Sequence, residues 1–356
     1  MPDLAAFRSE FPVLERKAYL NAGSNGPAPR RGIEAAQARL DSELEIGRGT
    51  PAHWEGIDAI RDPLRATLAA LLRTTTDRLA ITGSTTHGMN AVLQGLALGA
   101  GDELLTTTEE HPGLLAPLHA ARQRTGASIR TGPFGEIAHH IRPETKLVAC
   151  SHVSWVNGAV VDTDALAAAA PAVLLDGAQS AGAVDVAVES LGCDFYAAAG
   201  QKWLCGSEGT GLLWLRDPEA LRADWTSYSS LADASDPTTM KPGAARFDTY
   251  SIPGPALAWS HAGAELFAAT GWDWVHTRGP ELAAGLADEL SANGRTVAPR
   301  GDTTLVAWES GDPEAESKRL EAEGIVVRHL PGTPYVRASV GAWSSESELE
   351  RLVSLS

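Results

Sequence analysis

The sequence predicts an α/β protein: a large part built on a mainly parallel sheet, followed by a smaller α+β part. Over the first two hundred residues, short apolar runs of strand length alternate with longer alanine-rich helical patterns. Such alternation indicates βαβ units and therefore a mainly parallel sheet. The stretch at residues 226–245 is rich in Ser, Asp, Pro and Gly, which indicates a loop or a seam between domains.

The elements expected follow from these runs, taken in chain order. Strands are predicted where the residues are β-branched or leucine-rich, at Arg78–Thr82, Glu103–Thr107, Lys146–Ser151, Val173–Asp176 and Gly209–Leu215. Helices are predicted after the first two strands, from Gly83 and Ser84 to about Leu98 and over Gly113–Thr125. The second part is predicted to hold helices at Pro255–Thr270 and Pro280–Ala292, a strand at Thr303–Glu309, a helix, a strand at Ile325–Arg328 and a final helix.

The length of the chain, 356 residues, is enough for about two domains. We expect an N-terminal arm at residues 1–18, a large domain at residues 19–240 and a small C-terminal domain at residues 241–356, to which the arm contributes. Hydrophobic residues make up 44% of the chain and charged residues 21%, which is ordinary for a globular protein with a large core.

The charge and the cysteines exclude several classes of protein. The formal net charge is −16, so nucleic acid and anionic membrane surfaces are repelled and are not expected as partners. The longest small apolar stretch, Ala165–Leu175, is too short to span a bilayer. Three cysteines without regular spacing and a start without a signal-peptide pattern predict a cytoplasmic protein without a disulfide framework. No metal site is expected.

The predicted site lies beyond the carboxyl ends of the strands, where ligands bind to such sheets. This rule brings together four segments: Thr82–Thr86, Glu109–His111, Ser151–Trp155 and Asp176–Gln179. Asp176 could pair with a protonated pyridine nitrogen and make that ring an electron sink. Lys202 could form an imine through a desolvated amine of lowered pKa. Taken singly, the two are better explained as a strand-end aspartate and a surface lysine.

Four spaced motifs together resemble a known family. They are Asp176-Gly-Ala-Gln179, Cys193-Asp-Phe-Tyr196, Gly200-Gln-Lys202 and Gly209-Thr-Gly211. In order and spacing they resemble the core of the class V aminotransferase and cysteine desulfurase-like enzymes, which depend on pyridoxal 5′-phosphate (PLP) and have the fold-type I architecture. The resemblance implies that Lys202 carries PLP covalently and is catalytic, that Asp176 holds the pyridinium nitrogen, and that Gln179 contacts the ring hydroxyl oxygen.

Further segments extend the resemblance to the rest of the cofactor site. Gly83-Ser-Thr-Thr-His-Gly88 resembles the family's phosphate cup, which implies that Thr85 and Thr86 contact the phosphate. By itself, such a helix start is usually only an N-cap. Glu110-His111-Pro-Gly113 resembles the segment whose histidine stacks on the ring, which makes His111 a catalytic and cofactor-binding candidate.

Two positions next to Lys202 differ from the family pattern, and one later segment is expected to reach the partner subunit. Gln201 stands where many relatives have histidine and is also expected to bind the cofactor, whereas Ala199 replaces a common phosphate-binding hydroxyl. Arg246-Phe-Asp248 followed by Ser251 resembles the segment that reaches the partner subunit's phosphate. We therefore expect a homodimer with a shared active site, in which Ser251 binds the cofactor.

The substrate is expected to be a small amino acid. Arg328 and Arg337 resemble the family's carboxylate clamp, and a guanidinium suits a carboxylate bidentately. For Arg328, a solvated arginine is an equally simple explanation. Asn21, at the start of the resemblance, and Trp155, which stands where desulfurases usually have asparagine, are further candidates for substrate binding.

The stretch from Arg328 to Arg337 is short and has no cysteine, unlike the catalytic loop of desulfurases. This departure resembles the cysteine/cystine C–S lyase branch. It implies β-elimination from L-cysteine, cystine or a cysteine conjugate, giving pyruvate, ammonia and a thiol or persulfide, with Lys202 removing the Cα proton. The alternatives are an aminotransferase, epimerase or cysteine desulfurase of the same family, or a protein of this fold that binds PLP or a partner without catalysis.

Overall fold

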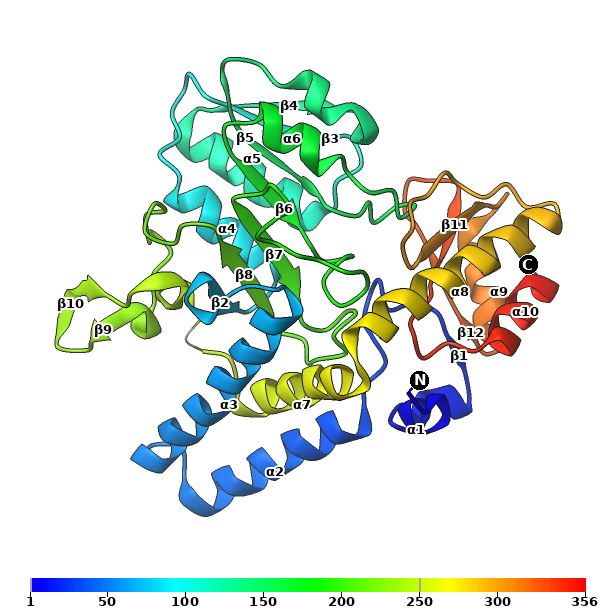
Figure 1. Ribbon diagram of the computed structural model, residues 1–356, viewed down its shortest axis with the longest axis horizontal. Coiled ribbons are helices and arrows are strands. Elements are labelled where there is room, and N and C mark those ends of the chain that lie inside the picture. The colour runs from blue at the N-terminus through cyan, green and yellow to red at the C-terminus, as the bar shows by residue number, and fades with distance from the viewer. Residues whose placement is uncertain (1, 250) are drawn as a thin grey trace.

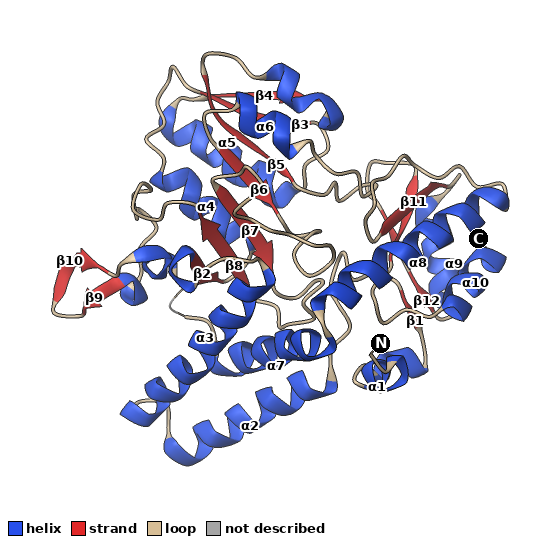
Figure 2. Ribbon diagram, in the orientation of Figure 1, coloured by secondary structure: helices blue, strands red, loops and turns tan. Residues whose placement is uncertain are grey.

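The computed structural model describes residues 2–249 and 251–356 and shows a seven-stranded sheet in a larger unit beside a small three-stranded sheet (Figures 1 and 2). In the large sheet the strand order is β2-β8-β7-β6-β5-β3-β4. The strands are β2 (Leu79–Thr82), β3 (Glu103–Thr107), β4 (Ser128–Gly132), β5 (Thr145–Ser151), β6 (Val173–Asp176), β7 (Phe195–Ala199) and β8 (Gly211–Leu215). Only β8 runs antiparallel to its neighbours, β2 and β7. The predicted mainly parallel sheet is therefore confirmed.

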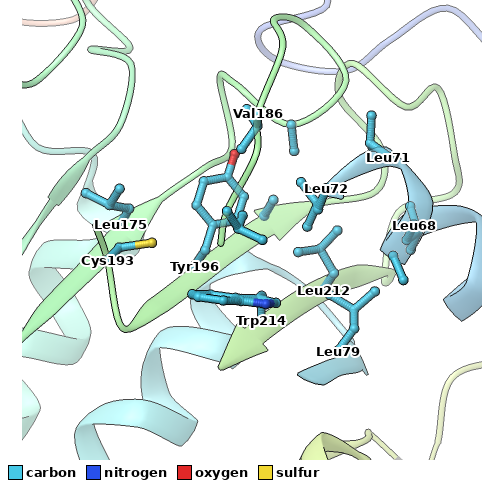
Figure 3. Close-up of a cluster of buried hydrophobic side chains, with 14 of the residues drawn as sticks. Leu68, Leu71, Leu72, Leu79, Leu175, Val186, Cys193, Tyr196, Leu212 and Trp214 are labelled. Atoms are coloured by element: carbon cyan, nitrogen blue, oxygen red, sulfur yellow. The ribbon is translucent and has the colours of Figure 1, made fainter. Parts of the chain in front are cut away.

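Helices cover both faces of this sheet. They are α3 (Pro51–Leu71), α4 (Thr85–Gly95), α5 (Pro112–Thr125), α6 (Thr163–Ala169) and α7 (Gly254–Thr270). α2 (Arg30–Ile46) packs against α7 and α3 on the side away from the sheet (Figure 1). Neighbouring residues of β3 show the two faces, because Leu104 packs in the cluster that contains α4 and α5 while Leu105 packs in the cluster that contains α3 and α6. Figure 3 shows the second cluster, where leucines of α3 meet Tyr196 and Trp214. Strands buried on both faces explain why their sequences are apolar without alternation.

Two strands of the large sheet were not predicted. β4 is an edge strand whose residues are mostly exposed or half-buried, so it lacks an apolar run. β7 reads Phe-Tyr-Ala-Ala-Ala and is fully buried, although alanine favours helices. Its burial between β6 and β8 overrides that preference. The stretch at residues 226–245, predicted as a loop, contains an exposed antiparallel hairpin of β9 (Leu231–Asp233) and β10 (Asp236–Met240) that projects from the large unit (Figure 1).

The small unit combines both ends of the sequence. Its antiparallel sheet has the order β11 (Leu305–Glu309), β14 (Tyr335–Ser339), β13 (Arg328–His329). Around it lie α8 (Trp272–Ala292), α9 (Pro313–Ala322) and α10 (Glu346–Leu355). Near the N-terminus, β1 (Ala18–Tyr19) pairs in parallel with β12 (Ile325–Val326). The division at residues 18/19 and 240/241 stays a prediction.

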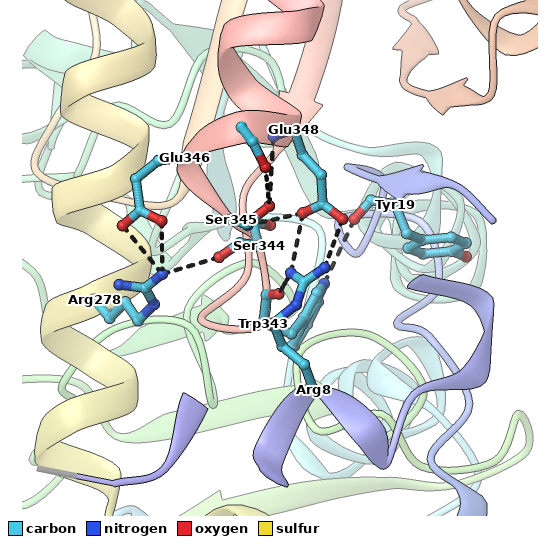
Figure 4. A network of polar contacts seen from close by, with 9 residues as sticks. Arg8, Tyr19, Arg278, Trp343, Ser344, Ser345, Glu346 and Glu348 are labelled. Atoms are coloured by element: carbon cyan, nitrogen blue, oxygen red, sulfur yellow. Dashed lines mark hydrogen bonds and ion pairs between the residues drawn. The ribbon is translucent and has the colours of Figure 1, made fainter. Parts of the chain in front are cut away.

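The first helix, α1 (Leu4–Ser9), is fastened to the small unit by an ion pair and a hydrogen bond. Arg8 pairs with Glu348 at 2.8 Å and donates to the Trp343 carbonyl, and Arg278 of α8 pairs with Glu346 beside them (Figure 4). Short 3-10 helices lie at Pro12–Glu15, Thr76–Arg78, Phe134–His140, Tyr228–Ser230 and Gly243–Phe247. None of the helices in the described part of the chain is long and apolar enough to cross a membrane.

Candidate active site

A cavity of about 130 Å³ lies where the strands of the large sheet meet the first turns of α4 and α5. Its lining consists of Ser84, Thr85, Thr86, His111, Gly113, Ser151, Val153, Trp155, Asp176, Ala178, Gln179, Ala199, Gln201 and Lys202. Eight of the predicted site residues are thus brought together from five separate segments of sequence. Asn21, Arg328 and Arg337 lie outside this lining, and Ser251 is exposed.

One wall of the cavity is the N-terminus of α4. Ser84 is the N-cap residue, and its hydroxyl accepts a hydrogen bond from the His87 backbone N–H at 3.1 Å. Thr86 Oγ1 donates to the Gly113 carbonyl at 2.9 Å, which joins the first turn of α4 to that of α5. The free backbone N–H groups and the dipole of a helix N-terminus favour a bound phosphate. Ser84 was not among the predicted contacts, since an N-cap serine is common.

The cavity lining also contains the predicted ring-binding residues Asp176 and Gln179. Asp176 ends β6 and accepts from the Ala178 N–H at 2.9 Å; burial raises the pKa of its carboxyl, while nearby Lys202 opposes that rise. Gln179 donates to the Gly23 carbonyl at 2.9 Å and accepts from the Trp203 indole at 3.1 Å. Both ends of this amide are held by the protein. Its orientation is therefore set before any ligand binds.

His111 is the N-cap of α5 and is held as a neutral imidazole. Its Nδ1 accepts a hydrogen bond from the Gly113 N–H at 3.0 Å, so the ring proton is on Nε2. Burial, and then the positive charges of Lys202, Arg328 and Arg337, lower its pKa to about 4. The Trp155 indole packs edge-on against the imidazole, with ring centroids 5.3 Å apart. His111 can therefore donate from Nε2 at neutral pH.

Lys202 follows β7 in a loop that is tightly fixed through its backbone. Gly26 N–H donates to the Gln201 carbonyl at 2.8 Å, and Cys205 N–H donates to the Lys202 carbonyl at 3.1 Å. Burial lowers the pKa of Lys202 to about 8; Asp176 works against this shift, whereas Arg337 and Arg328 add to it. At pH 7 about a tenth of the amine is neutral, far more than in a solvated lysine.

Arg337, on β14, is fully buried and only partly satisfied. It donates to the Trp155 carbonyl through Nη1, but Nε and Nη2 have no partner, and burial lowers its pKa to about 9. Among residues 2–249 and 251–356, no carboxylate pairs with it. A side-chain carbon on Gly23 would lie 2.6 Å from Nη2 and 2.7 Å from Ser339 Oγ. Only glycine therefore lets the guanidinium approach the backbone here, and its unpaired donors suit an anionic ligand.

Arg328 lies opposite Arg337 in the register of β13 and β14. Its Nη1 donates to Ser24 Oγ at 2.9 Å, and Ser24 in turn donates to Asn21 Oδ1 at 2.8 Å. Ser24 and Gly23, together with Ser339, whose buried hydroxyl has no partner, were not predicted. No local pattern marks them, because their contacts join residues about three hundred positions apart.

Glu110 is a buried carboxyl that was predicted only as part of a motif. It accepts from the Ser151 hydroxyl at 2.6 Å, from the Ser151 N–H, and from Thr107 at 2.7 Å. Burial raises its pKa to about 7 in spite of these bonds. It joins the end of β3 to the end of β5, and so fixes the turn that presents His111.

The segment that leads to Ser251 is anchored within its own chain. Asp248 is buried and forms a two-bond ion pair with Arg65 at 2.6 and 3.0 Å, and its carboxylate also accepts from the Ile81 N–H. Thr249 Oγ1 accepts from the Gly83 N–H at 3.1 Å. These contacts bring the segment beside β2 and the start of α4. The role of Ser251 in a partner's site stays a prediction.

These features define a class of protein, an α/β enzyme with a half-buried lysine and a buried carboxylate beside a helix N-terminus. The family model for class V aminotransferases matches residues 18–352, so the chain belongs to the aminotransferase class-V family. Enzymes of this family are PLP-dependent, and the chain is one of its cysteine desulfurase and C–S lyase-like members, which act on small amino acids.

Relatives within the family have several named activities. A probable cysteine desulfurase 2 of Mycobacterium leprae (strain TN) is 27% identical, with 99% of this chain and 95% of the relative aligned. Isopenicillin N epimerase of Streptomyces clavuligerus is also 27% identical, with 94% of this chain and 92% of the relative aligned. Among solved structures, the cystine C–S lyase C-DES in complex with its reaction product cysteine persulfide is similar with a TM-score of 0.91 and 27% identity, over 97% and 98% of the two chains.

A second C-DES structure is similar with a TM-score of 0.92 and 27% identity, over 99% of this chain and 98% of that one. It is a lysine-to-alanine mutant with glycine covalently linked to the PLP cofactor. The residues present here fit that cofactor. The cavity offers a lysine amine of lowered pKa, a buried carboxylate and a helix N-terminus, and the Gln201 side-chain oxygen is buried without a partner.

The lowered pKa of Lys202 predicts how cofactor attachment depends on pH. Lysine attacks an aldehyde only as the neutral amine, so the attachment rate to apo-enzyme is expected to rise with pH and reach half its maximum near pH 8. Timed mixing with PLP, borohydride trapping and mass spectrometry of the Lys202 peptide measure this rate. Nα-acetyllysine serves as the control for changes in PLP itself. Arg328→Met is expected to move the midpoint upward, and a midpoint near 10.5, the ordinary lysine value, would contradict the prediction.

Proposed function

We propose that this enzyme is a C–S lyase that acts by β-elimination on L-cysteine, cystine or a cysteine conjugate, giving pyruvate, ammonia and a thiol or persulfide. The observation that carries the proposal is the combination of a complete lysine–carboxylate site with the absence of an accessible thiol. The turn between Arg328 and Arg337 has no cysteine. A desulfurase needs a thiolate there to accept sulfur, whereas elimination needs none.

The three cysteines support this choice. Cys150, Cys193 and Cys205 are all buried, and none forms a disulfide. Burial raises the pKa of the Cys193 thiol to about 12 and those of Cys150 and Cys205 well above the ordinary value. The thiolate is the nucleophilic form, so these residues are poor sulfur acceptors.

The cofactor would be held by residues that line the cavity. Lys202 would carry it covalently, and its contacts would come from Thr85, Thr86, His111, Asp176, Gln179 and Gln201. When bound, PLP supplies an electron sink that makes a Cα proton acidic and permits loss of a substituent at Cβ. Asp176, kept in place by the Ala178 N–H, is the charge partner for the ring nitrogen.

The protein residues then divide the remaining work. The unpaired Nε and Nη2 of Arg337 bind the substrate carboxylate. The Lys202 amine, partly neutral at pH 7, takes the proton from Cα. The neutral His111 can donate a hydrogen bond from Nε2 to the leaving sulfur, and the Trp155 indole packs edge-on against its ring.

The test is a substrate panel of L-cysteine, L-cystine and an S-alkyl cysteine, incubated with the PLP-loaded enzyme. Pyruvate formed in equal amount to ammonia supports β-elimination. Accumulation of pyridoxamine phosphate would identify an aminotransferase, and alanine formed together with sulfide would identify a desulfurase. Appearance of the D-amino acid without pyruvate would identify an epimerase.

Replacing all three cysteines by alanine or serine is expected to leave elimination largely intact. The buried thiols only pack in the core, so the cost is about 1 kcal/mol or more of stability for each cysteine. Pyruvate formation is measured on the PLP-loaded triple variant, with circular dichroism as the check on folding. A folded variant that holds PLP but forms no pyruvate would favour a persulfide mechanism.

We further propose a homodimer in which Ser251 contributes to the partner's phosphate site. Ser251 is exposed although its segment is firmly anchored beside α4, and Ala199 offers no hydroxyl to the cavity. Sedimentation at micromolar concentration should give a dimer. Ser251→Ala should weaken PLP binding about fivefold, since one hydrogen bond is worth about 1 kcal/mol. A monomer that retains PLP and turns over substrate would refute the shared site.

A further inference from the structure

Residues 21–26, Asn-Ala-Gly-Ser-Asn-Gly, form a segment that contacts both units of the protein. On the side of the large unit, the Gly23 carbonyl accepts from Gln179 and the Gly26 N–H donates to the Gln201 carbonyl. On the side of the small unit, Asn21 forms a β-bridge with Ser339, two residues after Arg337. The segment therefore lies between the cofactor-binding residues and the two arginines.

Arg328 of β13 is joined to this segment by a hydrogen-bonded chain of fixed direction, from Arg328 to Ser24 to Asn21. A guanidinium can only donate, so Ser24 Oγ accepts from Arg328 Nη1 at 2.9 Å. The single proton of that hydroxyl is then given to Asn21 Oδ1 at 2.8 Å. The Ser24 N–H also donates to the Asn21 carbonyl at 3.0 Å. These bonds hold the Arg328 side chain on the side of the sheet where Arg337 lies.

This hydrogen-bonded chain of Arg328, Ser24 and Asn21, called the relay below, ends on a neutral group. In the described ranges, no carboxylate forms an ion pair with Arg328 or with Arg337, and the last member of the chain is an amide. Both arginines keep enough positive charge near the cavity to lower the pKa of Lys202 and of His111. Two cations placed opposite each other on neighbouring strands repel, and this repulsion is relieved when an anion binds between them.

We propose that Ser24 and Asn21 are positioning residues that direct Arg328 to the carboxylate bound by Arg337, and that the neutrality of Asn21 preserves the affinity of both arginines for an anionic substrate. The inference concerns carboxylate binding and rests on the proposed function only for the identity of the substrate. If residues 21–26 had only a structural role, Asn21→Asp would leave carboxylate binding unchanged, because aspartate accepts the same hydrogen bond as asparagine.

The experiment compares three variants of the PLP-loaded enzyme with a matched control. Asn21→Asp keeps the shape and the acceptor but adds a negative charge at the end of the relay. Ser24→Ala removes the relay, and Ser24→Thr retains the hydroxyl. Gln123→Glu adds the same charge by an equally isosteric change at an exposed position of α5, away from the cavity. Propionate is the probe, because it has a carboxylate and no amino group to react.

Propionate binding is measured by calorimetry, and KM and kcat are measured with cystine. We expect Asn21→Asp and Ser24→Ala each to weaken propionate binding five- to tenfold and to raise KM by the same factor, with kcat changed less than threefold. Ser24→Thr and Gln123→Glu should stay within twofold of the parent. Parent-like propionate binding by Asn21→Asp would overturn the proposal, as would failure of Ser24→Thr to restore binding. The expected propionate pattern in an enzyme that forms no pyruvate would refute the proposed function and leave the relay supported.

Discussion

Replacing Lys202 by alanine is expected to abolish turnover, with a loss of more than about 10⁴-fold in kcat, while the fold is retained. The variant loses the covalent anchor for PLP and the base for the Cα proton, and each of these contributes large factors to such enzymes. The lysine side chain is half-buried at the cavity, and its loop is fixed by backbone hydrogen bonds from Gly26 and Cys205. Those bonds do not depend on the side chain.

The measurement pairs pyruvate formation with borohydride reduction and peptide mapping. Lys318→Ala is the matched control, because Lys318 is an exposed lysine of α9 whose ion pair with Glu314 lies at the surface, where such pairs contribute little. Reduction should attach PLP to Lys202 in the control and to no lysine in Lys202→Ala. A reduced PLP adduct on another lysine of Lys202→Ala would show that Lys202 is not the carrier.

Replacing Arg337 by methionine is expected to raise KM roughly 100-fold and, in the same variant, to stabilise the unliganded protein. Loss of the two unpaired donors removes about 2–3 kcal/mol of charge-assisted hydrogen bonding to the substrate. The stability gain follows from the lowered pKa of this guanidinium. A base whose pKa is lowered by folding costs stability at every pH below that value, and the cost fades only as the pH rises above it.

At pH 7 the full cost is present, and an apolar side chain of similar length removes it. We expect a gain of about 1 kcal/mol or more in the free energy of unfolding, measured by urea denaturation of the apo-protein. Arg337→Lys, which keeps a charge but not the planar fork, should raise KM without the stability gain. An Arg337→Met variant with parent-like KM would exclude this residue from substrate binding.

Much of the fold could be predicted because its strands are short, apolar and buried. The predicted bounds of β3 and β6 agree with the structure, and both strands are short leucine-containing segments that are buried throughout inside the sheet. β4 was not predicted because it is an edge strand, which need not be apolar. β7 was not predicted because its three alanines favour a helix. The hairpin of β9 and β10 has no buried face to mark it.

The residues of the candidate site likewise divide into those that the sequence could predict and those that it could not. Asp176, His111 and Thr86 could be found because a parallel sheet brings the ends of its strands to one edge, whatever lies between them in sequence. Gly23 and Ser24 could not be found, because their roles arise only when the N-terminal segment lies against β13 and β14. Burial, and with it the pKa of every group in the cavity, is likewise a property of the assembled chain.

The parallel pairing of β1 with β12 joins Ala18 to Ile325, and it has a consequence for how the polypeptide matures on the ribosome. Synthesis proceeds from the N-terminus, and domains commonly begin to fold as they emerge. β1 leaves the ribosome before its partner strand β12, which is made about three hundred residues later. The large sheet can thus form while residues 18–26 still lack their neighbours, and pairings so distant in sequence form slowly. The contacts of residues 21–26 with Arg328 and Arg337 are therefore expected to form last, after the helix N-terminus that receives the cofactor phosphate.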